Sequence, residues 1–130
     1  MILFICTGNT CRSPMAQALA CSRGHQAQSA GLQVPFPSPA SPEARKAAER
    51  RGLSLENHIA RQVTGEMLAR AEKIYPMTCA HARMIQAYFP EYAEKIHPLS
   101  PEIPDPFGGD EMIYESCIQR IEAALIAAGL

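Results

Sequence analysis

Apolar residues along the chain follow two patterns, short continuous runs and stripes repeated every three or four positions. The run at residues 1–5 is long enough for one buried strand, whereas the chain ends in a stripe typical of a helix. The runs predict four strands, at residues 1–5, 25–32, 73–77 and 94–99. The helix-compatible segments lie between and after them, at residues 14–22, 43–51, 64–71, 78–88 and 110–128, with Ser41 and Thr64 as the expected N-caps of the second and third. Strands alternating with helices predict an α/β fold around a parallel sheet.

Prolines modify this pattern at the third and fourth predicted strands, which contain Pro76 and Pro98. Proline has no N–H group to donate to a neighbouring strand, so we expect the end of the third strand to be free on one side. The segment at residues 100–112 is dense in proline and glycine and is too long for a simple connector. Loops of this kind often carry functional residues.

Length and composition indicate a single domain at residues 1–130, soluble and globular, with 47% apolar and 19% charged residues. The net charge of −1 argues against nucleic acid as a partner, and no apolar run approaches the length needed to cross a membrane. The five cysteines are an odd number without zinc spacing, which predicts a reducing, cytoplasmic location and no metal site. A monomer or weak dimer is expected.

The residues after the first strand suit the binding of a phosphoryl group. Cys6 ends the strand, a glycine-containing loop follows, and Arg12 precedes a helix for which Ser13 is the expected N-cap and Pro14 the first residue. Backbone N–H groups at a helix N-terminus converge on an anion, and a guanidinium binds two phosphate oxygens at once. The expected phosphate-binding loop comprises Thr7, Gly8, Asn9, Thr10, Cys11, Arg12 and Ser13. Positive potential favours a thiolate, so Cys6 is the candidate nucleophile.

The motif Cys6-x5-Arg12-Ser13 within CTGNTCRSPMA closely resembles the low-molecular-weight protein tyrosine phosphatase family. The competing interpretation is a buried structural cysteine beside a surface arginine. The sequences SAG at residues 29–31, HIARQVT at residues 58–64 and DPF at residues 105–107 match further blocks of the family. The resemblance implies a three-layer α/β/α, Rossmann-like fold with a four-stranded parallel sheet. It places the ligand at the carboxyl ends of the strands.

The resemblance also implies a cysteine-dependent protein phosphatase that works through a phosphocysteine intermediate. Asp105 would act as general acid and then as general base for water, and Phe107 would form one wall of the substrate pocket. Without the resemblance, a turn aspartate followed by a packed phenylalanine is the favoured interpretation. Arg12 and the loop N–H groups supply the countercharge, so no metal or cofactor is expected.

Three further roles follow from the resemblance. His58 would support the phosphate-binding loop through Asn9, although a histidine in a connector is often merely packed or exposed. The Ser13 hydroxyl would hydrogen-bond the sulfur of Cys6 and make it a better leaving group. Cys11 would form a reversible disulfide with Cys6, which makes the enzyme redox-regulated.

Two positions bear on the substrate, a phosphorylated protein side chain. Most tyrosine-specific relatives have an aliphatic residue in place of Thr10 and a second aromatic residue in place of Gly108. Threonine with Asp-Pro-Phe-Gly resembles the family's bacterial protein-arginine phosphatase branch, so phosphoarginine is slightly favoured over phosphotyrosine.

Two alternatives stay open, a thioredoxin-coupled arsenate reductase and a non-catalytic phosphopeptide-binding module. Such reductases share a CTGN-x-CRS loop but need a further cysteine pair, and this chain has only Cys79 near its middle. Cys79 and His81 lie near the start of a predicted helix, where a loop-facing role is open, but partly packed helix residues are the favoured interpretation.

Overall fold

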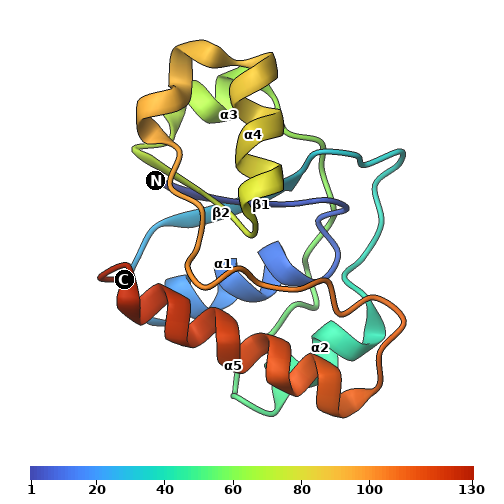
Figure 1. The fold of residues 1–130 in the computed structure, drawn as a ribbon. Coiled ribbons are helices and arrows are strands. Elements are labelled where there is room, and N and C mark those ends of the chain that lie inside the picture. The colour runs from blue at the N-terminus through green and yellow to red at the C-terminus, as the bar shows by residue number, and fades with distance from the viewer.

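Strand β1 (Ile2–Cys6) is the central strand of a three-stranded parallel sheet in the computed structural model, which describes residues 1–130 (Figure 1). Its neighbours are β2 (Ala27–Gly31) and β3 (Lys73–Pro76), and the strand order is β2-β1-β3. Ile2 pairs with Ala27 on one side and with Lys73 on the other. All three strands therefore end at the same edge of the sheet, where the chain leaves β1 at Cys6.

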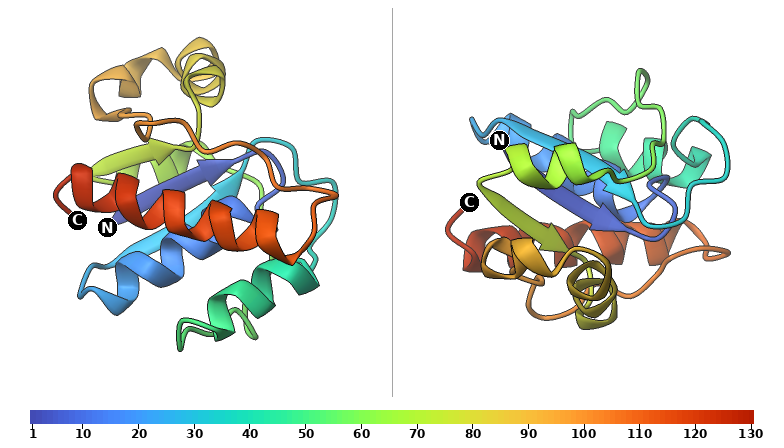
Figure 2. Two further views of the ribbon diagram at one scale, coloured as in Figure 1. Left: turned by 60° about the horizontal axis from the view of Figure 1, so that its bottom comes forward. Right: turned by 90° about the horizontal axis from the view of Figure 1, so that it is seen from above.

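Helices cover both faces of the sheet (Figure 2). They are α1 (Arg12–Ser22), α2 (Pro42–Glu49), α3 (Gly65–Arg70), α4 (Cys79–Tyr88) and α5 (Glu111–Ala127), with a 3₁₀ helix η1 (Pro90–Lys95). The side chains of β1 alternate between two apolar clusters. Phe4 packs in the cluster formed with α1, α2 and α5, whereas Leu3 and Ile5 pack with α3 and α4. The predicted three-layer α/β/α arrangement is confirmed. No helix of the structure combines the length and the apolar character that crossing a membrane requires.

The predicted fourth strand is reduced to an isolated parallel bridge between Ile74 and Ile96. Two N–H groups of this segment donate to β3, that of His97 to the carbonyl of Ile74 at 2.8 Å and that of Leu99 to the carbonyl of Pro76 at 2.9 Å. The nitrogen of Pro76 faces the same segment as its carbonyl but carries no hydrogen. Pro76 therefore removes one hydrogen bond of this ladder, and the sheet has three strands rather than four.

Helix α1 begins at Arg12, two residues earlier than predicted, and Ser13 is not its N-cap. The N-cap position is Cys11, which makes no side-chain capping hydrogen bond. The other four α-helices do have side-chain caps, at Ser41, Thr64, Thr78 and Asp110. Among the five α-helices, only α1 therefore starts without such a cap, and the hydroxyl of Ser13 contacts Cys6 and Asn9 instead.

Candidate active site

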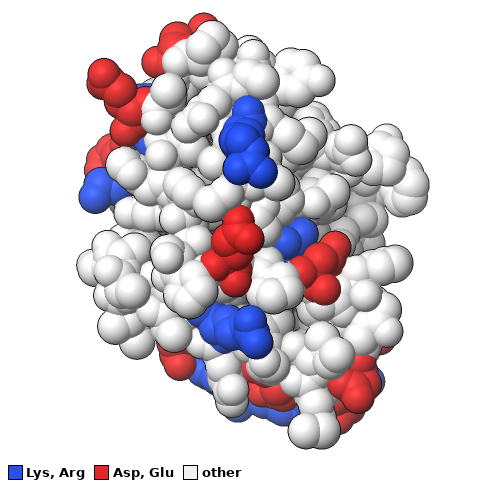
Figure 3. Space-filling model, in the orientation of Figure 1, with Lys and Arg blue, Asp and Glu red and all other residues white.

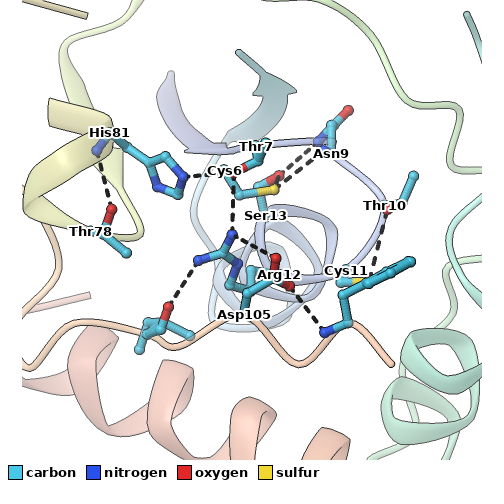
Figure 4. A network of polar contacts seen from close by, with 12 residues as sticks. Cys6, Thr7, Asn9, Thr10, Cys11, Arg12, Ser13, Thr78, His81 and Asp105 are labelled. Carbon is cyan, nitrogen blue, oxygen red and sulfur yellow. Dashed lines mark hydrogen bonds and ion pairs between the residues drawn. The ribbon is translucent and has the colours of Figure 1, made fainter. Parts of the chain in front are cut away.

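The thiol of Cys6 is held at the base of the loop that joins β1 to α1 (Figure 4). Its sulfur lies 2.9 Å from the hydroxyl of Ser13 and accepts a hydrogen bond from the backbone N–H of Asn9 at 3.3 Å. Asn9 also donates its side-chain amide to the Ser13 hydroxyl at 2.8 Å. Because that hydroxyl already accepts from Asn9, its own proton is free to be donated to the sulfur. Two donors therefore converge on the sulfur of Cys6.

Asn9 fixes the loop in a left-handed backbone conformation, with φ of 56°. Its side-chain amide also donates to Ser29 at 2.9 Å, and its side-chain oxygen accepts the N–H of Arg61 at 3.0 Å. The Nε2 atom of His58 lies 2.7 Å from the Asn9 carbonyl, which can only accept, so this nitrogen donates. These bonds offset the cost of the uncommon conformation. The structure thus places His58 against Asn9, through the backbone rather than the side chain.

Partial burial lowers the pKa of His58, although its bond to Asn9 works in the opposite direction. His58 is therefore neutral at neutral pH and keeps the single Nε2–H that the Asn9 carbonyl needs.

The guanidinium of Arg12 is 5% exposed and lies between Thr7 and Asp105 (Figure 4). One nitrogen donates to the carbonyl of Ile103 at 3.0 Å. The other lies 3.5 Å from the Thr7 hydroxyl and 3.7 Å from a carboxylate oxygen of Asp105. A buried cation with one distant, half-exposed counter-ion has unused capacity for an anion.

A cavity of about 230 Å³ joins these groups. It is lined by Cys6, Thr7, Gly8, Thr10, Cys11, Arg12, Asp105 and Phe107. The chain therefore brings two segments about 100 positions apart to one hollow. The face drawn in Figure 3 carries isolated acidic and basic groups in a largely uncharged surface, without an extended patch of one sign. Recognition of an anion on this face is therefore a property of the cavity.

The loop that carries Asp105 is anchored beside the Cys6 loop. Ile103 donates its N–H to the Met77 carbonyl at 3.0 Å, and its own carbonyl accepts from Arg12. Asp105 is half exposed, and one of its oxygens accepts the N–H of Phe107 at 3.1 Å, which shapes a tight turn. Phe107 is 83% exposed at the rim of the cavity. The predicted acid and pocket-wall residues therefore both face the cavity that holds Cys6.

Cys11 lines the same cavity, but its sulfur contacts other residues than Cys6. It lies 3.2 Å from the hydroxyl of Ser41 and 3.4 Å from that of Tyr114, which is 2% exposed. Burial raises the pKa of the Tyr114 phenol, and its contact with Cys11 raises it further. All five cysteines are free thiols in the structure. The sequence marked Ser41 only as a helix cap and did not mark Tyr114.

For His81 the sequence favours packing over a loop-facing role, whereas the structure places its ring against the loop. His81 is 7% exposed, and its Nε2 atom lies 2.9 Å from the Thr7 hydroxyl (Figure 4). Burial and the charge of Arg12 lower its pKa to about 4. The available signal was topological: α4 begins where β3 ends, next to the end of β1, so its first turn lies beside the Cys6 loop.

Comparisons with known proteins agree with this geometry. The model of the low molecular weight phosphotyrosine protein phosphatase family matches residues 1–128. The protein-arginine-phosphatase of Bacillus subtilis (strain 168) is 34% identical to this chain over 95% of it and 91% of the relative. The low molecular weight protein-tyrosine-phosphatase Etp of Escherichia coli (strain K12) is 34% identical over 95% of this chain and 88% of its own.

One solved structure has a similar fold and a modified active site. It is a cysteine-to-serine mutant of the YwlE arginine phosphatase with a phosphorylated active site serine. The match covers 99% of this chain and 94% of the mutant's chain. The TM-score is 0.90 and the sequence identity is 34%.

Proposed function

This chain belongs to the low molecular weight phosphotyrosine protein phosphatase family, and we propose that Cys6, Arg12 and Asp105 carry its catalysis. The chain is a cysteine-dependent protein phosphatase, a hydrolase of phosphorylated side chains. The observation that carries the assignment of residues is that the Cys6 thiol, the buried Arg12 guanidinium and the Asp105 carboxylate line one cavity.

In the first step the sulfur of Cys6 attacks phosphorus in line with the leaving group. The S–P bond forms as the P–O or P–N bond of the substrate breaks, and Asp105 gives its proton to the departing atom. Arg12 and the N–H groups of residues 7–13 hold the equatorial oxygens as charge redistributes. Asn9 and His58 keep the loop in the shape that aims those N–H groups inward.

In the second step water hydrolyses the phosphocysteine. Asp105, now a carboxylate, takes a proton from the water as its oxygen bonds to phosphorus. The S–P bond breaks, the electron pair stays on the sulfur, and inorganic phosphate is released. The Ser13 hydroxyl, 2.9 Å from that sulfur, stabilises the departing thiolate. The phosphorylated serine in the YwlE mutant supports a covalent intermediate at this position.

For the substrate, phosphoarginine is slightly favoured over phosphotyrosine. Thr10 lines the cavity, and a hydroxyl there accepts hydrogen bonds from a guanidinium, whereas a methyl-rich wall prefers a flat ring. This chain is 34% identical both to the protein-arginine-phosphatase of B. subtilis and to the tyrosine phosphatase Etp. Sequence identity alone therefore does not separate the two substrates.

Replacing Thr10 by isoleucine tests this preference. We expect the ratio of kcat/KM for phosphoarginine to that for p-nitrophenyl phosphate to fall on the order of tenfold, because the hydroxyl is lost and apolar surface is gained. The Thr10→Ser variant keeps the hydroxyl and is the matched control. An unchanged ratio in Thr10→Ile would show that Thr10 does not set the preference.

Neither alternative function gains support from a specific contact. An arsenate reductase needs a cysteine pair to pass electrons onward, and Cys79, exposed at the start of α4, is the only thiol in the middle of the chain. A module that only binds phosphopeptides would not need the two donors that converge on the sulfur of Cys6.

We further propose that Cys11 protects Cys6 from overoxidation. Peroxide oxidises the Cys6 thiolate to a sulfenic acid, and attack by the Cys11 thiolate releases water and forms a disulfide, which an added dithiol reduces. Cys11 must first leave Ser41 and Tyr114. Wild-type enzyme inactivated by peroxide should therefore regain activity with dithiothreitol, whereas Cys11→Ser should not. Cys21→Ser, which removes an exposed thiol, is the control. Full recovery of Cys11→Ser would contradict the proposal.

Residues 1–130 are inferred to form one domain, because both apolar clusters share strand β1. A cytoplasmic location and a monomer or weak dimer stay predictions.

A further inference from the structure

Two neighbours of Thr7 can donate hydrogen bonds to its hydroxyl oxygen. Thr7 is exposed where it lines the cavity, with Nε2 of His81 at 2.9 Å and a guanidinium nitrogen of Arg12 at 3.5 Å. A threonine hydroxyl has one proton to donate and two lone pairs to accept with. Arg12 can only donate, so it occupies one lone pair. The direction of the His81 contact decides where the hydroxyl proton points.

The burial of His81 determines that direction. A pKa of about 4 makes the ring neutral at neutral pH, so it carries one N–H, on Nδ1 or on Nε2. Nδ1 is buried and has no hydrogen-bond partner. A proton there would leave a buried N–H donor unpaired, and such donors are rare in folded proteins. The proton therefore sits on Nε2, which donates to Thr7.

With both lone pairs occupied, the Thr7 proton has no acceptor among the protein's hydrogen bonds and faces the cavity beside Cys6 and Arg12. We propose that His81 is a positioning residue that commits the Thr7 hydroxyl to donate to a phosphoryl oxygen in the cavity. The inference rests on the proposed function, because it needs a phosphoryl group bound at Cys6. It adds a side-chain donor to the N–H groups of the loop. The competing role for His81 is packing of α4 against the loop.

Four single variants separate the two roles. Thr7→Val keeps the shape of the side chain and removes the hydroxyl, and Thr7→Ser keeps the hydroxyl. His81→Leu removes the ring donor, whereas His81→Gln carries an amide N–H that reaches the position of Nε2. The probes are inhibition by inorganic phosphate and kcat/KM for p-nitrophenyl phosphate, with the midpoint of thermal unfolding measured for every variant.

Thr7→Val should weaken phosphate inhibition and lower kcat/KM about tenfold or more, the scale of a lost hydrogen bond to a charged group. His81→Leu should show a similar loss, and His81→Gln and Thr7→Ser should recover most of it. The double variant Thr7→Val/His81→Leu should be no worse than Thr7→Val alone, because His81 acts through Thr7. Additive losses, or a His81→Gln variant as impaired as His81→Leu, would overturn the proposal.

A second measurement does not depend on activity and uses only the wild-type chain. It therefore tests the inference even where a variant does not fold. The ¹⁵N chemical shifts of the His81 ring in the wild-type chain at pH 7 report which nitrogen is protonated. We expect a neutral ring with the proton on Nε2; a proton on Nδ1, or a charged ring, would overturn the inference. Failure of the proposed function would show instead as a wild-type chain that does not hydrolyse phosphorylated side chains, whatever the state of His81.

Discussion

The Cys6→Ser variant is expected to lose turnover of phosphorylated side chains by a factor on the order of 10⁵, the scale seen when a nucleophile within a catalytic unit is removed. A serine hydroxyl stays protonated near neutral pH, so it attacks phosphorus poorly. Any phosphoserine that forms is a dead end, because an alkoxide leaves far less readily than a thiolate. The YwlE mutant with its phosphorylated active site serine is an example of such a trapped state.

Steady-state hydrolysis of p-nitrophenyl phosphate and of phosphoarginine measures this loss. Cys21→Ser is the matched control, because it makes the same chemical change at an exposed thiol. Inorganic phosphate should still bind the Cys6→Ser variant, since Arg12 and the loop N–H groups are retained. Turnover within tenfold of wild type in Cys6→Ser would rule out Cys6 as the nucleophile.

The Asp105→Asn variant is expected to lose about 10²–10⁴ in kcat/KM, which reports the first step, for substrates whose leaving group needs a proton. Asparagine can still accept the N–H of Phe107, so the turn is preserved while the proton donor is removed. The loss should be larger for phenyl phosphate than for p-nitrophenyl phosphate, because p-nitrophenolate leaves without a proton. A plot of rate against leaving-group acidity should therefore be steeper in Asp105→Asn than in wild type.

Glu102→Gln provides the control on the same loop. Its carboxylate accepts the N–H of Cys79 at 2.6 Å and does not line the cavity. The backbone contact with Cys79 lowers the pKa of Glu102, which makes it a poor proton donor near neutral pH. We expect near wild-type kcat from Glu102→Gln. A larger loss of activity in Glu102→Gln than in Asp105→Asn would show that Glu102, rather than Asp105, is the general acid.

The sequence predicted best what lies within one contiguous stretch. The apolar run before Cys6 and the turn residues after it are neighbours along the chain, so strand β1, the loop and α1 could be predicted from local preferences. The same holds for the caps at Ser41 and Thr64. The layered α/β class followed from the alternation of strand and helix. The expectation that the end of β3 is free on one side was wrong, because the carbonyl of Pro76 accepts the N–H of Leu99 at 2.9 Å.

Features set by contacts between distant segments could not be predicted. Within the loop itself, local preferences indicate Ser13 as a helix cap, and only the family resemblance indicated its contact with the sulfur of Cys6 at 2.9 Å. His81 and Tyr114 contact the loop from positions 74 and 103 residues further along the chain. The lost fourth strand is intermediate: each proline was visible, but only the sheet shows that the nitrogen of Pro76 faces residues 96–99.

Identifying the phosphorylated residue in the working enzyme tests the central claim most directly. Wild-type and Asp105→Asn chains would be mixed with substrate, quenched in acid within milliseconds, digested and analysed by mass spectrometry. We expect one phosphoryl group on the Cys6 peptide, absent after alkylation of that thiol, and longer-lived in Asp105→Asn because the base for water is missing. A phosphoryl group on any other side chain, or full turnover after Cys6 has been alkylated, would contradict the central claim.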